Sequence, residues 1–187
     1  MRTFTDQRQS ETQDELWAVQ HEPVYTLGQA GRQEYLRETG SVPVIRCDRG
    51  GQVTYHGPGQ AVIYCLVDLR RRPWGIKSMV ERLETAVIGL LAQHGVRAER
   101  RTGAPGVYVA GSKIAALGLR VRQGCSYHGL ALNVDLDLAP FAHIDPCGFA
   151  GLTVTRTRDL GCEEGVDIMS ARLMCLVRES LDQERPT

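Results

Sequence analysis

The chain has 187 residues, with 22 basic and 22 acidic side chains, no net charge and a pI near 7.0. This length suggests one domain over residues 1–187, and the charge balance argues against non-specific nucleic-acid binding. A hydrophobic content of 42% excludes a disordered chain, and no apolar run approaches the ~18 residues of a membrane span. Because the first residues are also too polar for a signal peptide, we expect a cytoplasmic protein without membrane partners.

Hydrophobic spacing predicts two helices and several short strands in chain order. Residues 76–94 carry apolar side chains at steps of three and four, and Gly95 stands at the position of a C-terminal glycine cap. A second amphipathic helix is expected to begin with Asp167 as its N-cap. Strands are predicted at residues 15–21, 42–47, 61–69, 106–110, 113–121, 127–136 and 152–156. This order favours an α+β fold, a mixed and largely antiparallel sheet packed by helices.

A glycine-rich segment, RGGQVTYHGPGQ at residues 49–60, lies between two predicted strands. Glycine allows a backbone to approach a ligand closely, and the segment also carries a guanidinium, hydroxyls and an imidazole. A hairpin with glycine-rich turns is the plainer interpretation, but the density of functional groups favours a binding loop. The segment matches neither the dinucleotide fingerprint nor a Walker motif.

The basic residues are unevenly distributed between the two types, since only Lys77 and Lys113 are lysines and the remaining 20 are arginines. Lys77 lies near the start of the first long helix and is interpreted as an ordinary surface residue. Lys113 lies in a mostly apolar predicted strand, where a lysine is costly unless it is paired or deprotonated. A surface lysine is the common alternative, but in an arginine-rich chain Lys113 points to a removable proton, which a guanidinium does not offer.

Six cysteines are present, and none has the spacing of a zinc site or a CxxC motif. Cys147 differs from the other five because it lies in a turn between Pro146 and Gly148, near Gly151. It is the predicted nucleophile if any thiol reacts. His128 and Asn133 are candidate supporting residues, each equally compatible with ordinary hydrogen bonding, whereas His21, His94 and His143 are interpreted as structural or solvent-facing.

Together these segments resemble the octanoyltransferases of lipoate biosynthesis. The resemblance covers residues 14–155 and rests on ELWAVQHEPVYTLGQAG, RGGQVTYHGPGQ, APGVYV with GSKIAALGLR, GCSYHGLALN and the DPCG turn. It implies a fold similar to that of biotin and lipoate protein ligases. The implied reaction moves an octanoyl group from acyl carrier protein to a lysine of lipoyl domains, in 2-oxoacid dehydrogenase complexes and the glycine cleavage H protein.

The resemblance also assigns roles to individual residues. Cys147 would carry the acyl thioester, and Lys113 would lower the pKa of that thiol and move protons. The acyl pocket would be formed by three segments: Arg49, Gly50, Gly51, Gln52, Val53, Thr54, Tyr55 and His56; Ala116, Leu117 and Gly118; Gly129, Leu130 and Ala131. The family uses no ATP, metal or other cofactor. One departure is that the family's pattern has a strand and a helix before the segment matching Phe4-Thr5-Asp6, which here begins near Met1.

Two alternatives remain open on the residues alone. An ATP-dependent lipoate or biotin ligase would need a phosphate-binding glycine motif that the sequence does not show. A non-catalytic acyl-binding module would not need Cys147 or Lys113. Local arginine clusters, expected to dock acidic partners or to form surface ion pairs, occur at Arg70, Arg71, Arg72, Arg97, Arg100, Arg101, Arg120 and Arg122.

Overall fold

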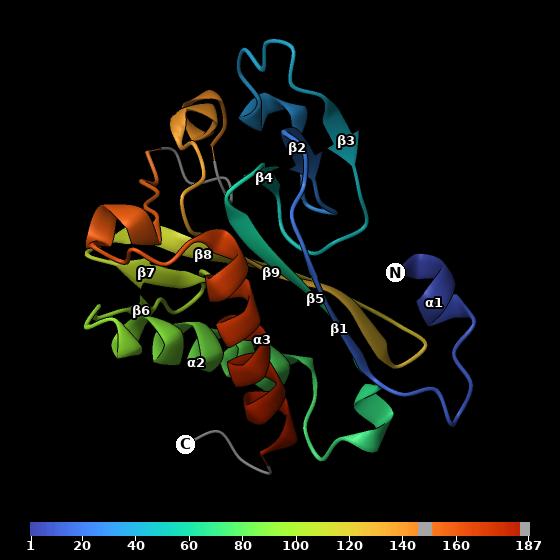
Figure 1. Ribbon diagram of the computed structural model, residues 1–187. Helices are drawn as coiled ribbons and strands as arrows, with labels where there is room; N and C mark the ends of the chain where they lie inside the picture. Colours follow the sequence, from blue (N-terminus) through green and yellow to red (C-terminus); the bar gives the residue numbers. More distant parts are fainter. Residues whose placement is uncertain (146–150, 184–187) are drawn as a thin grey trace.

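The computed structural model describes residues 1–145 and 151–183, which form two β-sheets and two long helices (Figure 1). The larger sheet has the strand order β1-β5-β9-β8-β7-β6, and the smaller has the order β3-β2-β4. The strands are β1 (Glu15–Val19), β2 (Val24–Leu27), β3 (Val44–Arg46), β4 (Val53–His56), β5 (Gln60–Leu66), β6 (Glu99–Arg100), β7 (Val107–Val109), β8 (Ser112–Arg122) and β9 (Cys125–Asn133). The α-helices are α1 (Arg2–Asp6), α2 (Ile76–Gln93) and α3 (Val166–Asp182), with 3-10 turns at Gln33–Tyr35, Leu69–Arg71, Ala139–His143 and Thr157–Leu160.

The two long helices follow the predicted periodicity. In α2, the residues from Met79 to Leu91 at helical spacing are buried, and Gly95 has the positive φ of +73° that a glycine cap adopts. The predicted N-cap of α3 is wrong, because the helix begins after Gly165 and Asp167 lies inside its first turn. A carboxylate there still faces the positive end of the helix dipole.

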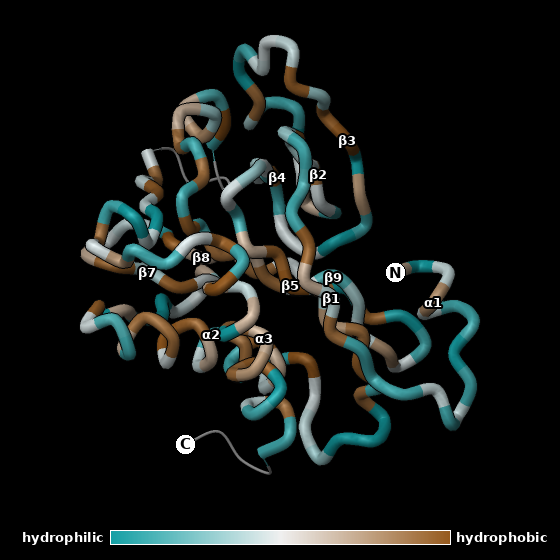
Figure 2. Tube along the Cα trace, viewed as in Figure 1, coloured by the Kyte–Doolittle hydropathy of each residue, from teal (hydrophilic) through white to brown (hydrophobic). Residues whose placement is uncertain are grey.

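The register of three central strands gives the large sheet two different faces. On one face Ala61 of β5 stands opposite Leu132 of β9, and Leu132 stands opposite Ala115 of β8. These apolar residues pack against α2 and α3 to form the main core, and Figure 2 shows hydrophobic stretches along β5 and α2. Since side chains alternate along a strand, the intervening residues point to the opposite face, away from the helices.

The smaller sheet covers part of that opposite face. Its strand β2 pairs antiparallel with β4 and parallel with β3. Tyr25 and Tyr55 from this sheet form a second core with Phe141. The ring centroid of Tyr55 lies 5.3 Å from that of Tyr25 and 5.7 Å from that of Phe141. The prediction of a mixed, largely antiparallel sheet with packed helices is confirmed, but β2, β4 and this second sheet were not predicted.

The strand predicted at residues 152–156 is wrong as a strand. Val154 makes only an isolated parallel bridge to Lys113. The Lys113 backbone is nevertheless held twice, because its N–H donates to Thr153 O at 2.9 Å and its carbonyl accepts from the Thr155 N–H at 3.0 Å. The segment after residues 146–150 is thereby fixed against β8.

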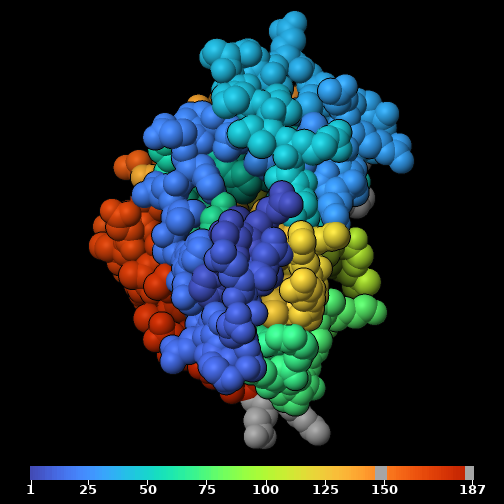
Figure 3. Space-filling model, turned by 90° about the vertical axis from the view of Figure 1, so that its right-hand side faces the viewer, coloured from blue at the N-terminus to red at the C-terminus, as the bar shows by residue number. Residues whose placement is uncertain are grey.

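The N-terminal residues pack beside the β8–β9 hairpin, as the space-filling view in Figure 3 shows (dark blue beside yellow). Arg122 of the hairpin pairs with Asp6 of α1 at 2.9 Å. Further along, the Asp14 carboxylate accepts hydrogen bonds from Arg8, Arg71 and Arg72 at 2.7–2.8 Å. Within the part of the chain that the structure describes, no helix is long and apolar enough to span a membrane.

The close approach of β9 to β5 gives a test of the register. A Cβ at Gly129 would lie 1.9 Å from the Ile63 carbonyl oxygen, so we expect Gly129→Ala to lower the free energy of unfolding by about 3 kcal/mol. Gly89 in α2 has nothing within 4 Å of its Cβ position, so Gly89→Ala should raise it by about 0.5–1 kcal/mol. Urea unfolding of both variants measures these changes. Equal stability of Gly129→Ala and the wild type would contradict the register.

Candidate active site

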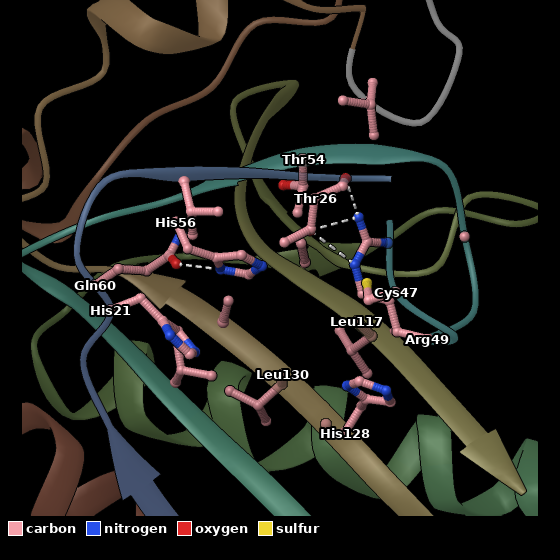
Figure 4. Close-up of a pocket in the computed structure, with 18 of the residues that line it drawn as sticks. His21, Thr26, Cys47, Arg49, Thr54, His56, Gln60, Leu117, His128 and Leu130 are labelled. Carbon is pink, nitrogen blue, oxygen red and sulfur yellow. Dashed lines mark hydrogen bonds between the residues drawn. The ribbon is translucent and has the colours of Figure 1, made fainter. Parts of the chain in front are cut away.

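A cavity of about 290 Å³ lies between the large sheet and the glycine-rich segment, on the face away from α2 and α3 (Figure 4). Its size is at the low end of ligand pockets, which suits a small or slender ligand. Of the predicted site residues, those that line it are Arg49, Gly51, Gln52, Val53, Thr54, His56, Lys113, Ala116, Leu117, Gly118, His128, Gly129, Leu130, Ala131 and Asn133.

The floor of the cavity consists of three rows of side chains across β5, β9 and β8. The register pairs Gln60 with Asn133, then Val62 with Ala131 and Ala116, then Tyr64 with Gly129 and Gly118. The first row is polar, and the other two contain mostly small or apolar groups. The small side chains leave an apolar trough that runs along the strands from the polar row.

Arg49 holds the glycine-rich segment over this trough. Its guanidinium donates to the Thr26 carbonyl and hydroxyl at 2.7 and 2.9 Å, and to the carbonyls of Gln52 and Gly50 at 2.7 and 3.0 Å. Figure 4 shows the bonds between Arg49 and Thr26. These contacts tie the segment to β2, so the structure gives Arg49 a clear part in shaping the cavity wall.

Two predicted pocket residues do not line the cavity. Tyr55 is 4% exposed because alternation along β4 turns its ring into the second core, beside Tyr25 and Phe141. Gly50 lies against β8, where its N–H donates to Leu119 O at 3.0 Å and a Cβ would lie 2.7 Å from that oxygen. Both residues therefore lie outside the cavity and pack against the elements that form its wall.

Lys113 is buried at the polar end of the trough. Only 4% of the residue is exposed, so it is not the surface lysine of the common alternative. Its ammonium group donates to Pro105 O at 3.2 Å and lies 5.3 Å from the centre of the Tyr108 ring. Lys113 therefore lines the cavity while its ammonium group is held by the backbone just before β7.

The same end of the trough is joined to the segment that follows the predicted nucleophile. Asn133 accepts from Gln60 Nε2 at 2.9 Å and donates to Thr155 O at 3.0 Å. Asn133 thus links the polar row to the segment that is bonded to the Lys113 backbone. Cys147 itself lies outside the described residues.

A carboxylate–imidazole pair lies at the other end of the trough. His128 Nε2 donates to Asp48 Oδ1 at 2.9 Å, and the Tyr127 hydroxyl donates to Asp48 Oδ2 at 2.5 Å. The His128 and Tyr127 rings stack with centroids 5.0 Å apart. Burial lowers the pKa of His128, although Asp48 acts in the opposite direction.

Two further histidines lie across the cavity from His128 (Figure 4). Burial lowers the pKa of His56 to about 4, and the Gln60 amide oxygen is 2.7 Å from its Nδ1. His21 lies 2.5 Å from the Tyr64 hydroxyl and its pKa is also lowered by burial. The interpretation of His21 as merely structural or solvent-facing was incomplete, since it lines the cavity.

The described cysteines lie in different environments. Cys65, Cys125 and Cys162 are buried, whereas Cys175 is exposed. Cys47 lines the cavity, so a second thiol must be considered when a reactive cysteine is tested. Among the residues that the structure describes, no group of three or more His, Cys, Asp or Glu side chains is arranged to hold a metal ion.

Several arginines of the predicted docking clusters are engaged within the chain. Arg70 pairs with Asp68 at 2.7 Å, and Arg71 and Arg72 pair with Asp14 at 2.7 and 2.8 Å. Arg100 pairs with Glu84 at 3.2 Å. These contacts favour the ion-pair interpretation at those positions. Arg101 is exposed and lies over the Tyr108 ring at 4.6 Å, near Lys113.

Residues 1–174 match the protein family described as the lipoyl protein ligase A/B catalytic domain. The chain belongs to this family. It is 58% identical to an octanoyltransferase of Halorhodospira halophila over 182 residues, which is 97% of this chain and 84% of the relative. It is 62% identical to an octanoyltransferase of Thiobacillus denitrificans over 167 residues, 89% of this chain and 77% of the relative. The predicted relationship to octanoyltransferases, and the acyltransferase class, are confirmed.

Solved ligase structures share the fold at low sequence identity. A lipoate-protein ligase A bound with ATP has a TM-score of 0.81 and 17% identity, covering 99% of this chain and 79% of that one. A biotin protein ligase from Aquifex aeolicus has a TM-score of 0.59 and 13% identity, covering 83% and 69%. The predicted similarity to the biotin and lipoate ligase fold is confirmed.

The lowered pKa of His56 predicts how stability depends on pH. Between pH 6.5 and about 4 the unfolded chain protonates this imidazole while the folded protein keeps it neutral, so folding loses stability as pH falls. We expect His56→Gln to lose less stability than the wild type between pH 7 and 4, by up to about 3 kcal/mol. Urea unfolding across this range measures the difference. His143→Gln, which changes a surface histidine, is the control, and identical pH profiles for His56→Gln and wild type would contradict the prediction.

Proposed function

We propose that this protein transfers an octanoyl group from octanoyl-acyl carrier protein to a lysine of lipoyl domains, through a thioester on Cys147. The observation that supports this most strongly is the buried Lys113 at the polar end of an apolar trough. The acyl chain would lie along the small side chains of the middle rows, with its carbonyl near Lys113 and Asn133. No metal, ATP or other cofactor is required, because the donor thioester is already activated.

In the first half-reaction the Cys147 thiolate attacks the thioester carbonyl of the donor. A free thiol has a pKa of about 8.5, so a neighbouring ammonium increases the thiolate fraction at neutral pH. A bond forms between the Cys147 sulfur and the acyl carbon, and the bond to the carrier sulfur breaks. The carrier thiolate leaves with the proton of the Lys113 ammonium, which becomes a neutral amine.

In the second half-reaction the neutral amine of the acceptor lysine attacks the Cys147 thioester. An amide bond forms, the bond to the Cys147 sulfur breaks, and the thiolate is restored. Lys113 takes up the proton that the acceptor nitrogen loses, which returns the pair to its starting state. An arginine does not perform this step, because its pKa is above about 12.

The nucleophile is tested by intact mass after incubation with octanoyl-acyl carrier protein. We expect the wild type to gain one octanoyl group and Cys147→Ala to gain none and to transfer none. The matched control is Cys47→Ala, which removes the thiol that lines the cavity and should leave labelling intact. An octanoyl adduct on Cys147→Ala that disappears with Cys47→Ala would reassign the nucleophile.

The proton-transfer role is tested by Lys113→Arg, which keeps the positive charge. We expect the acyl-enzyme to form more slowly, because the carrier sulfur must then leave as an unprotonated thiolate. Transfer to the lipoyl-domain lysine should slow by about 100-fold, because general acid–base catalysis typically contributes that much or more. Rapid-mixing mass spectrometry separates the two steps. Lys77→Arg, at the other lysine of the chain, is the control, and a full transfer rate in Lys113→Arg would overturn the role.

Mass measurements on the protein and on a lipoyl domain also test the two alternatives, an ATP-dependent ligase and a non-catalytic acyl-binding module. Labelling of a lipoyl domain from free octanoate only when ATP is added would support a ligase, the activity named in the structure that shares this fold. Tight binding of the carrier or lipoyl domain without any mass gain would support a non-catalytic module.

A further inference from the structure

The end of the trough opposite Lys113 is closed by an unusual feature of β9. The rows from Gln60–Asn133 to Tyr64–Gly129 span four residues of strand, about 13 Å along the sheet. The next residue of β9 beyond the last row is His128, which also lines the cavity and has only 12% of its side chain exposed.

By strand alternation His128 belongs on the other face of the sheet. It stands opposite Leu119 of β8, and Leu119 packs against the main core with α2 and α3. Instead, His128 has φ of +60°, a left-handed conformation that a residue with a side chain rarely adopts. Its imidazole and the ring of the preceding residue, Tyr127, therefore reach the same carboxylate, Asp48, although neighbours in a strand normally point to opposite faces.

Backbone strain of this kind costs of order 1–3 kcal/mol and persists only where surrounding contacts impose it. Here the contacts are the hydrogen bond to Asp48, the stack on Tyr127 and an edge contact with Tyr64, whose ring centroid is 6.2 Å away. These contacts hold a rigid imidazole across the end of an apolar trough that begins at Lys113.

We propose that the His128 imidazole, held by Asp48, is the end wall of the acyl cavity and limits the length of acyl chain that the protein accepts. This inference rests on the proposed function. It assigns His128 to chain-length selection and Asp48 to positioning the wall. A chain that starts at the Lys113 end extends toward Tyr64 and meets the ring, so longer chains are excluded by contact with an imidazole that Asp48, Tyr127 and Tyr64 hold in place.

The test compares acyl carrier proteins loaded with octanoyl, decanoyl and dodecanoyl groups. His128→Gly removes the ring and also suits the positive φ, so the relief of backbone strain offsets part of the contacts that are lost with the ring. We expect its labelling rate with decanoyl relative to octanoyl to rise by about tenfold, because two more methylene groups become buried. Asp48→Ala should raise the decanoyl-to-octanoyl labelling ratio as well, but by less than His128→Gly does. Asp48→Asn should keep the wild-type ratio, since the amide oxygen still accepts from His128.

The control for added backbone freedom is Gln123→Gly, a position with φ of +51° in the β8–β9 turn. It should leave the length preference unchanged. An unchanged decanoyl-to-octanoyl ratio in His128→Gly would overturn the proposal.

Calorimetry of free octanoate, decanoate and dodecanoate binding tests the end wall independently of the acyl-transfer reaction. If the wild type forms no acyl-enzyme, the proposed function fails. A longer-chain preference of His128→Gly in binding would still support the end wall, and an unchanged preference would refute it.

Discussion

Antiparallel pairing of β5, β9 and β8 is the constraint on which the remaining structure depends. Because their side chains alternate between faces in register, one face collects Ala61, Ile63 and Leu132 for the helices, and the other collects the small and polar residues that line the cavity. A shift of one residue in any of these strands would exchange the faces and place the core residues in the cavity. The core and the candidate active site are therefore two outcomes of a single register.

This arrangement also determines which residues can share the polar end of the trough. Lys113 lies on β8, Asn133 at the end of β9, and both are bonded to residues 153–155. The ends of two strands and the segment after residues 146–150 thus form one hydrogen-bonded unit. Any group that this unit positions is held by backbone bonds, which keep their geometry better than long side chains do.

Sequence patterns predicted local structure more accurately than contacts between distant residues. The 3.6-residue spacing of α2 and the glycine after it are visible without knowledge of any partner, and both are confirmed. In contrast, β2 and β4 are short, and their identity as strands depends on each other and on β3. Residues 152–156 have an alternating, strand-like pattern, but only Val154 forms a bridge, because the two backbone bonds of this segment to Lys113 do not continue along β8.

The residues of the candidate active site show the same contrast between local patterns and long-range contacts. Glycine density located the glycine-rich segment, and the scarcity of lysine singled out Lys113. The resemblance assigned Tyr55 to the pocket, and its position within a strand was not recognised. His21 was missed because its partners, Tyr64 and His56, are 43 and 35 residues away and nothing near it indicates them. The contact between Asp48 and His128 joins positions 80 residues apart, and the positive φ that permits it carries no signal in composition.

The hydrogen bonds of Arg49 have a consequence for ligand affinity. They fix the cover of the cavity to β2 through the carbonyl of Thr26 and brace the cover itself through the carbonyl of Gln52. Gly28 lets the two segments meet, since a Cβ there would lie 2.4 Å from Gly51 O. The entropy lost in ordering this cover is lost during folding, before any acyl chain arrives. Binding then draws on apolar burial with little further loss of chain freedom, so the protein is preorganised for its ligand by an interaction that also stabilises the fold.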